Sequence, residues 1–137
     1  MNVIEIPFVK KAGITKNEKG ELELPFTTDI HNHLETIHAS AQFTLAETAS
    51  GEFLQTLFPH LVGKVIPVLR EVKVKFKKPA VKNIIAYPST TNDATEKFNT
   101  QLSNKGRASI TVDVEIRDIE ATVTCIANYN WFVQKIK

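Results

Sequence analysis

The sequence predicts an α+β fold in which a curved antiparallel sheet wraps around one long central helix. The helical pattern over residues 39–57 is apolar or small on nearly every side, so other structure must surround this helix. Residues 108–116 and 121–133 alternate between apolar and polar side chains and are separated by a tight turn near Asp118, which predicts a hairpin. Short strands, one long helix and then four strands follow one another along the chain, an order typical of α+β proteins.

Local patterns predict the remaining elements. Residues 3–9 predict a short strand or an arm, and the polar residues 10–20, with two glycines, predict a loop. The segment Leu22–Leu24 alternates briefly before Pro25, which indicates a short strand. After the central helix we expect strands at 72–76 and 84–87, and a small surface helix at 93–104 that Gly106 closes.

Composition limits the class of protein. We expect one domain over residues 1–137, because the length and the 42% hydrophobic content suit a single globular core. The net charge of +2 is too small to indicate nucleic acid, and the single cysteine excludes an internal disulfide. The chain shows neither a signal-peptide pattern nor a membrane-spanning run, so we expect a cytoplasmic protein without a membrane partner. We expect no metal and no cofactor.

The central helix contains one acidic side chain where its pattern is most apolar, Glu47. Burial among apolar groups raises the pKa of a carboxylate and makes it a stronger base, which suits general base catalysis near neutral pH. Gly51, one turn later, leaves space for a ligand. The helix start at Ala39 and Ser40 offers free backbone N–H groups and the positive end of the helix dipole, which suit an oxyanion.

The spacing between these groups has a geometric consequence. Glu47 lies eight residues after Ala39, so the two are about 12 Å apart along the helix axis. A base has to approach its proton to about 3 Å, or through one water. One chain therefore cannot easily supply both groups to one carbonyl, whereas two helices packed antiparallel across a twofold axis can. We expect a homodimer with shared sites.

Two motifs resemble those of a known family. The first runs from Asn32 through His38-Ala39-Ser40 to Phe43-Thr44-Leu45-Ala46-Glu47, and the second is the ending Phe76-Lys77-Lys78-Pro79-Ala80 of a basic strand. They resemble the Asn…His-Gly-Gly…Phe-x-Leu-Ala-Asp and aromatic-x-x-Pro-Ala motifs of hotdog-fold acyl-CoA thioesterases of the phenylacetate-pathway type. The first motif resembles even more closely the branch of uncharacterised thioesterases in which Glu replaces Asp. The likeness extends from about residue 30 to the C-terminus.

The resemblance implies a hotdog fold and hydrolysis of an acyl-CoA or acyl-carrier-protein thioester, in a homodimer or homotetramer, with Glu47 as general base or nucleophile. It also implies that Asn32 orients a water or the substrate carbonyl, and it includes His38 in the site; the simpler interpretation is a turn residue and a helix-entry histidine. Ala39 and Ser40 stand where the family has glycines, and Leu69 stands where many relatives have Ser or Thr. The alternative function is a hotdog protein that binds acyl groups without cleaving them.

A basic strand face completes the set of candidate residues. Lys73, Lys75, Lys77 and Lys78 alternate with, or directly follow, apolar residues, a pattern that is normally just solvated. A more specific interpretation is a landing site for the phosphates of coenzyme A or for an acidic carrier protein. The predicted catalytic residues are Glu47, Asn32 and His38, and the predicted substrate-binding residues are Ala39, Ser40, Gly51, Lys77 and Lys78.

Overall fold

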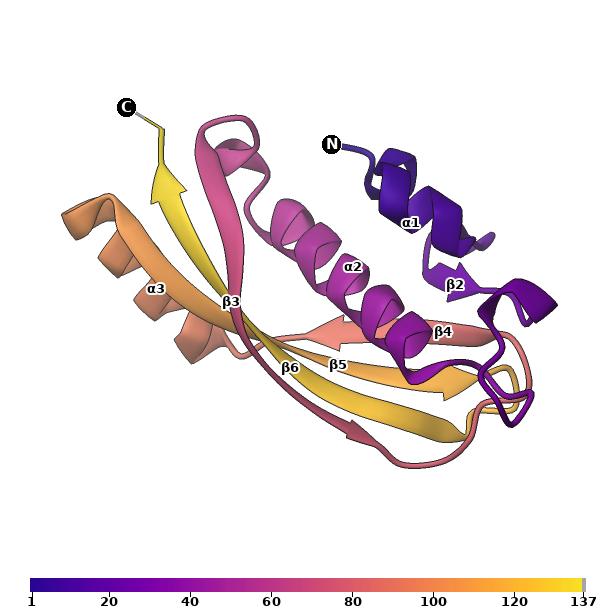
Figure 1. The fold of residues 1–137 in the computed structure, drawn as a ribbon. Helices are drawn as coiled ribbons and strands as arrows, with labels where there is room; N and C mark the ends of the chain where they lie inside the picture. The colour runs from indigo at the N-terminus through magenta and orange to yellow at the C-terminus, as the bar shows by residue number, and fades with distance from the viewer. Residues whose placement is uncertain (137) are drawn as a thin grey trace.

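The computed structural model describes residues 1–136 and shows a six-stranded antiparallel sheet that curves around one long helix (Figure 1). The strands lie in the order β1-β2-β4-β5-β6-β3. Their bounds are β1 Thr15–Lys16, β2 Leu22–Leu24, β3 Val65–Phe76, β4 Ile84–Ser89, β5 Arg107–Asp118 and β6 Val123–Lys135. The helices are α1 Pro7–Ala12, α2 Ala39–Leu57 and α3 Asn92–Lys105, with short 3-10 turns at Val3–Glu5, Thr28–Ile30 and Pro59–Leu61.

Helix α2 spans the predicted range and packs against the inner face of the sheet. Leu45 and Ala46 are fully buried in the core. Buried polar side chains on this helix are satisfied locally, because the hydroxyls of Thr44 and Thr48 donate to carbonyls one turn earlier at 2.8 and 2.7 Å. The helix ends before Pro59, which cannot continue it. The predicted central helix is therefore confirmed.

Strands β5 and β6 form the predicted hairpin. Val112 pairs with Tyr129 and Val114 with Ala127, and all four side chains are buried. The turn is closed by Asp118, whose side chain accepts hydrogen bonds from two backbone N–H groups of the turn at 2.8 and 3.0 Å. The pairing shifts register at the turn end of the hairpin. Two consecutive residues, Thr124 and Cys125, are consequently both buried. The regular alternation of the sequence did not predict this interruption.

The N-terminal segment corrects a prediction. Residues 3–9 form neither a strand nor an arm but a 3-10 turn followed by α1. Pro7 takes the first helical position, where its fixed φ favours a helix, and Gly13 ends the helix with a φ of 90°. Part of the predicted loop over 10–20 is likewise helical, and Thr15–Lys16 pairs with β2.

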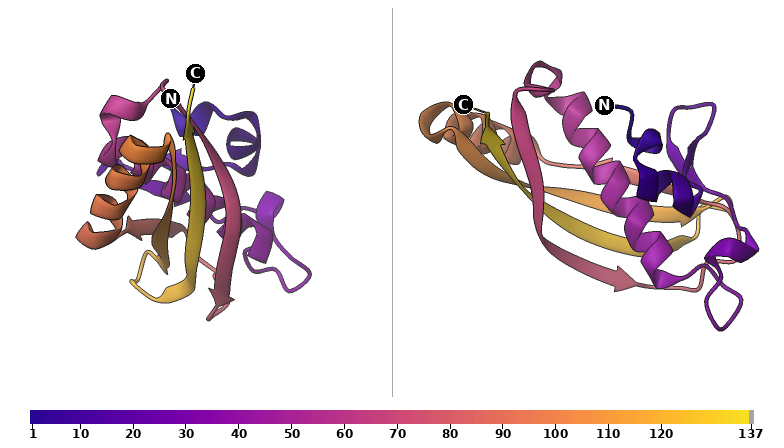
Figure 2. Two further views of the ribbon diagram at one scale, coloured as in Figure 1. Left: turned by 90° about the vertical axis from the view of Figure 1, so that its left-hand side faces the viewer. Right: turned by 45° about the horizontal axis from the view of Figure 1, so that its top comes forward.

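Strand β3 forms one edge of the sheet and is longer than the predicted 72–76. It pairs with β6 alone, and a bulge interrupts the pairing between Leu69 and Glu71. In Figure 1 and in the right-hand view of Figure 2, α2 runs between the N-terminal segment on one side and β3 on the other. The backbone groups on the outer side of β3 therefore have no strand partner among residues 1–136.

The remaining elements agree with their predictions in kind. Strand β4 continues two residues beyond the predicted 84–87. Helix α3 begins after Thr91, whose hydroxyl accepts from the Ala94 N–H at 3.0 Å, and ends at Gly106 with a φ of 74°. Its buried Phe98 meets Phe58, just beyond α2, with ring centroids 4.7 Å apart. In the described part of the chain no helix is both long and apolar enough to cross a membrane.

Candidate functional site

Glu47 is half-buried in the middle of α2. Burial is the cause that raises the pKa of its carboxyl group above the ordinary value of 4.5. Within residues 1–136 we find neither an ion pair nor a hydrogen bond to this carboxylate. By contrast Glu52, on the same helix, pairs with Lys16 at 2.8 Å. Glu47 is therefore a carboxylate that the described chain leaves unpaired and makes more basic.

The start of α2 is partly capped by His38. Its Nδ1 accepts a hydrogen bond from the Ser40 N–H at 3.0 Å, and its carbonyl accepts from the N–H groups of Ala41 and Gln42. The N–H of Ala39 has no hydrogen-bond partner in residues 1–136. The expectation that both predicted backbone donors are free is thus corrected. The Ser40 N–H is occupied, whereas the N–H of the exposed Ala39 is free.

Asn32 is occupied within its own loop. Its Oδ1 accepts from the N–H groups of Leu34 and Thr36 at 2.9 and 3.0 Å, and its Nδ2 donates to the Thr36 hydroxyl at 2.8 Å. These bonds close the loop that carries Glu35 at a φ of 60°. The loop leads through Ile37 directly into α2, so the Asn32 side chain fixes how the chain enters the helix.

Three hydrogen bonds that the sequence did not predict connect α2 to β6. Thr124 donates to Gln42 Oε1 at 2.8 Å, Tyr129 donates to the Phe43 carbonyl at 2.8 Å, and Trp131 Nε1 donates to Ser50 Oγ at 2.9 Å. Ser50 Oγ itself donates to the Glu47 carbonyl at 2.7 Å. Tyr129 and Trp131, at alternate positions of β6, were the available signal, whereas Thr124 lies outside that alternation; the sequence does not show which helix residues the three meet.

Trp131 also lies against Gly51. A Cβ atom at Gly51 would lie 3.5 and 3.7 Å from two carbons of the indole ring. A side chain at this position would therefore face Trp131, and the expectation that Gly51 leaves space for a ligand stays a prediction. On the other side of Glu47, the Phe43 and Tyr129 rings meet edge to face with centroids 5.4 Å apart. Aromatic rings thus lie one helical turn before and one turn after Glu47.

The predicted basic residues separate into two groups. Lys77 and Lys78 follow β3, in a segment whose Ala80 carbonyl accepts from the Ile37 N–H at 2.8 Å, so these lysines lie near the start of α2. Lys73 and Lys75 pair in register with the exposed Asn128 and Ile126, on the sheet face opposite α2. Only the first group is placed to meet a ligand at the helix start.

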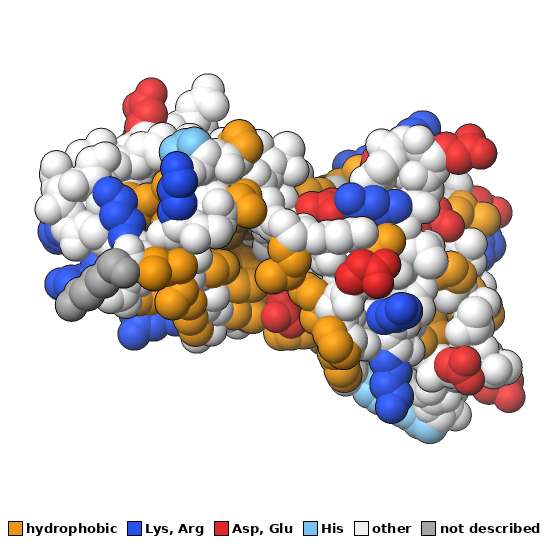
Figure 3. Space-filling model, turned by 90° about the horizontal axis from the view of Figure 1, so that it is seen from above, with side chains coloured by type: hydrophobic (Ala, Val, Ile, Leu, Met, Phe, Trp, Pro, Cys, Tyr) orange, Lys and Arg blue, Asp and Glu red, His pale blue; other side chains and the backbone are white. Residues whose placement is uncertain are grey.

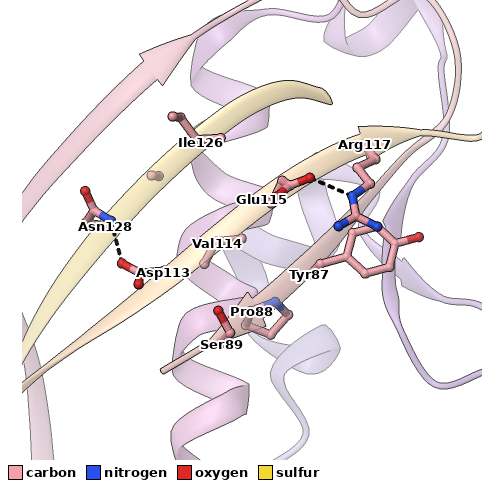
Figure 4. A pocket seen from close by; sticks show the side chains of 10 residues that line it. Tyr87, Pro88, Ser89, Asp113, Val114, Glu115, Arg117, Ile126 and Asn128 are labelled. Carbon is pink, nitrogen blue, oxygen red and sulfur yellow. Dashed lines mark hydrogen bonds and ion pairs between the residues drawn. The ribbon is translucent and has the colours of Figure 1, made fainter. Parts of the chain in front are cut away.

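Two depressions lie away from Glu47. One, of about 290 Å³, is on the outer face of the sheet, where Asp113, Glu115 and Arg117 point away from α2 (Figure 4). Arg117 is already engaged there, because it pairs with Glu115 at 2.7 Å and lies over the Tyr87 ring. The other, of about 300 Å³, is between α2 and β4 and includes Phe53. Neither depression contains Glu47 or the helix start.

Hydrophobic side chains gather along one side of the molecule in the view of Figure 3, with an acidic side chain among them. Exposed apolar residues on β3 include Ile66 and Val68. On α2, Phe43 and Leu57 are only partly buried against the core. Apolar surface on an edge strand and a neighbouring helix is typical of an interface with another chain.

Cys125 is a small buried residue. Burial raises the pKa of its thiol to about 11. The thiolate that a nucleophile needs is therefore disfavoured near neutral pH.

A curved antiparallel sheet around one long central helix defines this chain as a hotdog-fold protein. Residues 4–133 match the family described as a domain of unknown function, DUF4442. The chain belongs to this family. Comparison with curated proteins gives no match.

Solved structures share the fold at low sequence identity. A protein of unknown function from Pseudomonas aeruginosa, described as a probable thioesterase, is 21% identical with a TM-score of 0.81, over 98% of this chain and 91% of that one. A thioesterase from Haemophilus influenzae is 15% identical with a TM-score of 0.67, over 97% of this chain and 86% of that one. A Bacillus halodurans protein solved with CoA is 21% identical with a TM-score of 0.68, over 89% of this chain and 72% of that one.

Proposed function

We propose that this protein hydrolyses the thioester bond of an acyl-CoA or acyl-carrier-protein substrate, with Glu47 as the general base. One observation carries the proposal: Glu47 is half-buried and unpaired on α2, with a raised pKa, in a helix whose first N–H is free. The similarity to thioesterase structures, and to one solved with CoA, supports the same substrate class.

The reaction needs a base for water and a donor for the oxyanion. In the proposed mechanism Glu47 takes a proton from water as the water oxygen bonds to the thioester carbon. The carbonyl π electrons move to the carbonyl oxygen, which accepts a hydrogen bond from the Ala39 N–H. The tetrahedral intermediate then collapses, the C–S bond breaks, and the leaving thiolate takes the proton from Glu47. Direct attack by the Glu47 carboxylate, which forms an anhydride that water then cleaves, is the alternative route.

A second copy of the chain completes the proposed site. The helix start and Glu47 of one chain are separated by about 12 Å along α2, and the unpaired edge of β3 and the apolar surface next to it are available for pairing. If two β3 edges pair antiparallel, the two α2 helices lie side by side in opposite directions. Ala39 of one chain then faces Glu47 of its partner.

The other predicted residues receive specific parts in this proposal. His38 caps α2 by accepting the Ser40 N–H, which leaves the Ala39 N–H as the free donor at the helix start. Asn32 shapes the loop that leads into the helix. Lys77 and Lys78, close to that helix start, would attract the phosphates of CoA or the acidic surface of a carrier protein.

The decisive test measures hydrolysis of a panel of acyl-CoA thioesters by detecting the free thiol that each reaction releases. Glu47→Gln removes the base but keeps the size of the side chain, so turnover should fall by about 10²–10⁴-fold. Glu52→Gln is the matched control, because it changes the same residue type on the same helix but disrupts only an ion pair with Lys16. Its turnover should match that of the wild type.

A second variant tests the oxyanion donor. Proline is well suited to the first helical position and has no N–H, so Ala39→Pro should remove this donor while preserving α2. Loss of one oxyanion-hole donor typically costs about 10²–10³-fold in turnover. If purified wild-type protein binds acyl-CoA but hydrolyses none of the panel, the protein is an acyl-binding protein and the proposed reaction is wrong.

A further inference from the structure

The peptide groups around Glu47 are tied to β6 from both sides. In helix α2 the Glu47 N–H bonds to the carbonyl four residues earlier, that of Phe43. This carbonyl also accepts the Tyr129 hydroxyl at 2.8 Å. The Glu47 carbonyl accepts the Ser50 hydroxyl at 2.7 Å, and Ser50 accepts Trp131 Nε1 at 2.9 Å. The acceptor for the Glu47 N–H and the carbonyl of Glu47 itself are therefore both held by residues of one neighbouring strand.

These contacts lie in a mostly buried part of the protein. Tyr129 and Ser50 have no exposed surface. The Trp131 ring lies beside Gly51, 3.5 Å from where a Cβ atom at that position would stand. Tyr129 is deeply buried, and its pKa is raised by burial and by the nearby Cys125 and Glu47, so its hydroxyl remains a donor. Hydrogen bonds in such surroundings are stronger than in water.

The carboxylate itself has no comparable support. Because no side chain in residues 1–136 bonds to it, its position is set by the backbone turn that carries it. A direct hydrogen bond from a neighbour would fix the carboxylate but would also lower its pKa and weaken it as a base. Support through the backbone fixes the turn while the carboxylate keeps its basicity.

We propose that Tyr129, and Trp131 acting through Ser50, are positioning residues that hold the Glu47 turn of α2 in its reactive place. This inference rests on the proposed function of Glu47. None of the three residues needs to touch the substrate, so their removal should lower kcat and leave KM nearly unchanged.

The test compares variants that each remove one α2–β6 hydrogen bond. Tyr129→Phe and Ser50→Ala remove the two bonds at the Glu47 turn. Thr124→Val is the matched control, because it removes the third bond between the same helix and strand, at Gln42, away from that turn. All three should lower thermal stability. For acyl-CoA hydrolysis, kcat should fall by about 10- to 100-fold in Tyr129→Phe and Ser50→Ala, but not in Thr124→Val.

A second measurement separates positioning from general loss of structure. In the Glu47→Gln background, Tyr129→Phe and Ser50→Ala should change the residual turnover by less than about twofold, because there is no base left to position. If kcat is the same in Tyr129→Phe, Ser50→Ala and the wild type, or falls equally in Thr124→Val, the positioning role is overturned while the thioesterase function stands. A wild-type protein without hydrolysis overturns both.

Discussion

Glu47 illustrates how one residue can oppose the stability of its own fold. A carboxylate that is buried without a partner costs free energy, because it loses hydration that nothing replaces. Most acids on this surface avoid that cost by exposure or by pairing, as Glu52 does with Lys16. An unpaired half-buried acid is therefore a feature to be explained by function rather than by stability.

The direction of the pKa shift of Glu47 determines how this residue changes the stability of the protein with pH. The folded state raises the pKa of Glu47 above the ordinary value of 4.5. Between the ordinary pKa and the raised pKa, the folded protein therefore binds more protons than the unfolded chain. The contribution of Glu47 to stability therefore falls as pH rises through this window, and the ionised form destabilises the fold above it. We expect Glu47→Gln to melt at a higher temperature than the wild type near neutral pH, with a difference that shrinks below pH 4.5.

Thermal melts of both proteins across this pH range measure the effect. A melting temperature for Glu47→Gln that is lower than that of the wild type near neutral pH would show that the carboxylate has a stabilising partner. If instead the expected higher melting temperature is found, Glu47→Gln combines a loss of turnover with a gain of stability, which is typical of catalytic residues.

His38 is an unusual helix cap, because its imidazole Nδ1 accepts the bond that Ser, Thr, Asp or Asn more often accept. His38→Ala should lower the free energy of unfolding by about 0.5–2 kcal/mol, since the Ser40 N–H loses its partner. His38→Asn should restore most of this loss. Urea unfolding of the three proteins is the measurement, and equal midpoints for the Ala and Asn variants would argue against a capping role.

At the scale of elements, Gly51 of α2 lies beside the Trp131 ring of β6. A glycine inside a helix costs roughly 0.5–1 kcal/mol relative to alanine. The Cβ of an alanine would meet the Trp131 ring at 3.5 Å, an ordinary contact distance. We therefore expect Gly51→Ala to raise the free energy of unfolding by up to about 1 kcal/mol, whereas Gly51→Leu should displace the ring and destabilise the protein.

Chemical unfolding, followed by the fluorescence of the single tryptophan, reports on this contact directly. A Gly51→Ala variant that is clearly less stable than the wild type would contradict the expectation that the space beside the indole ring accepts a methyl group. If the variant is more stable but slower in hydrolysis, Gly51 also serves the ligand, as its place one turn after Glu47 suggested.

At the scale of the whole molecule, the proposed shared site makes a quantitative prediction. Glu47→Gln and Ala39→Pro should each be nearly inactive alone. In a dimer that combines one chain of each, one site joins an intact Ala39 to an intact Glu47, and the other site has neither. When equal amounts are unfolded and refolded together, half of the dimers are mixed, so activity should return to about a quarter of the wild-type level.

Light scattering should show twice the mass of one chain for each variant and for the mixture. Refolding each variant alone is the control, and it should restore no activity. A mixture that remains inactive although mixed dimers form would show that both groups act within one chain. A strictly monomeric mass would contradict the shared site altogether.

The amino-acid sequence by itself determined the main elements and the candidate base. Periodicity depends only on which side chains avoid water, so it located α2 at 39–57 and the β5–β6 hairpin, and it identified Glu47 as an acid out of place. The motif around Asn32 and His38 added the hotdog fold, which the sheet order and the related structures confirm. Periodicity was wrong at residues 3–9, where Pro7 begins a helix in a segment too short for a clear pattern.

Only the tertiary structure decided which polar groups are free and which are used. The sequence cannot show that His38 occupies the Ser40 N–H, that Asn32 is used within its loop, or that Trp131 lies beside Gly51. Nor can it show that Lys73 and Lys75 lie on the face opposite α2 while Lys77 and Lys78 lie near its start. Hydrogen bonds between α2 and β6 join residues more than 80 positions apart. Their partners are set by how the helix docks on the sheet, which depends on the packing of the whole core rather than on any local pattern.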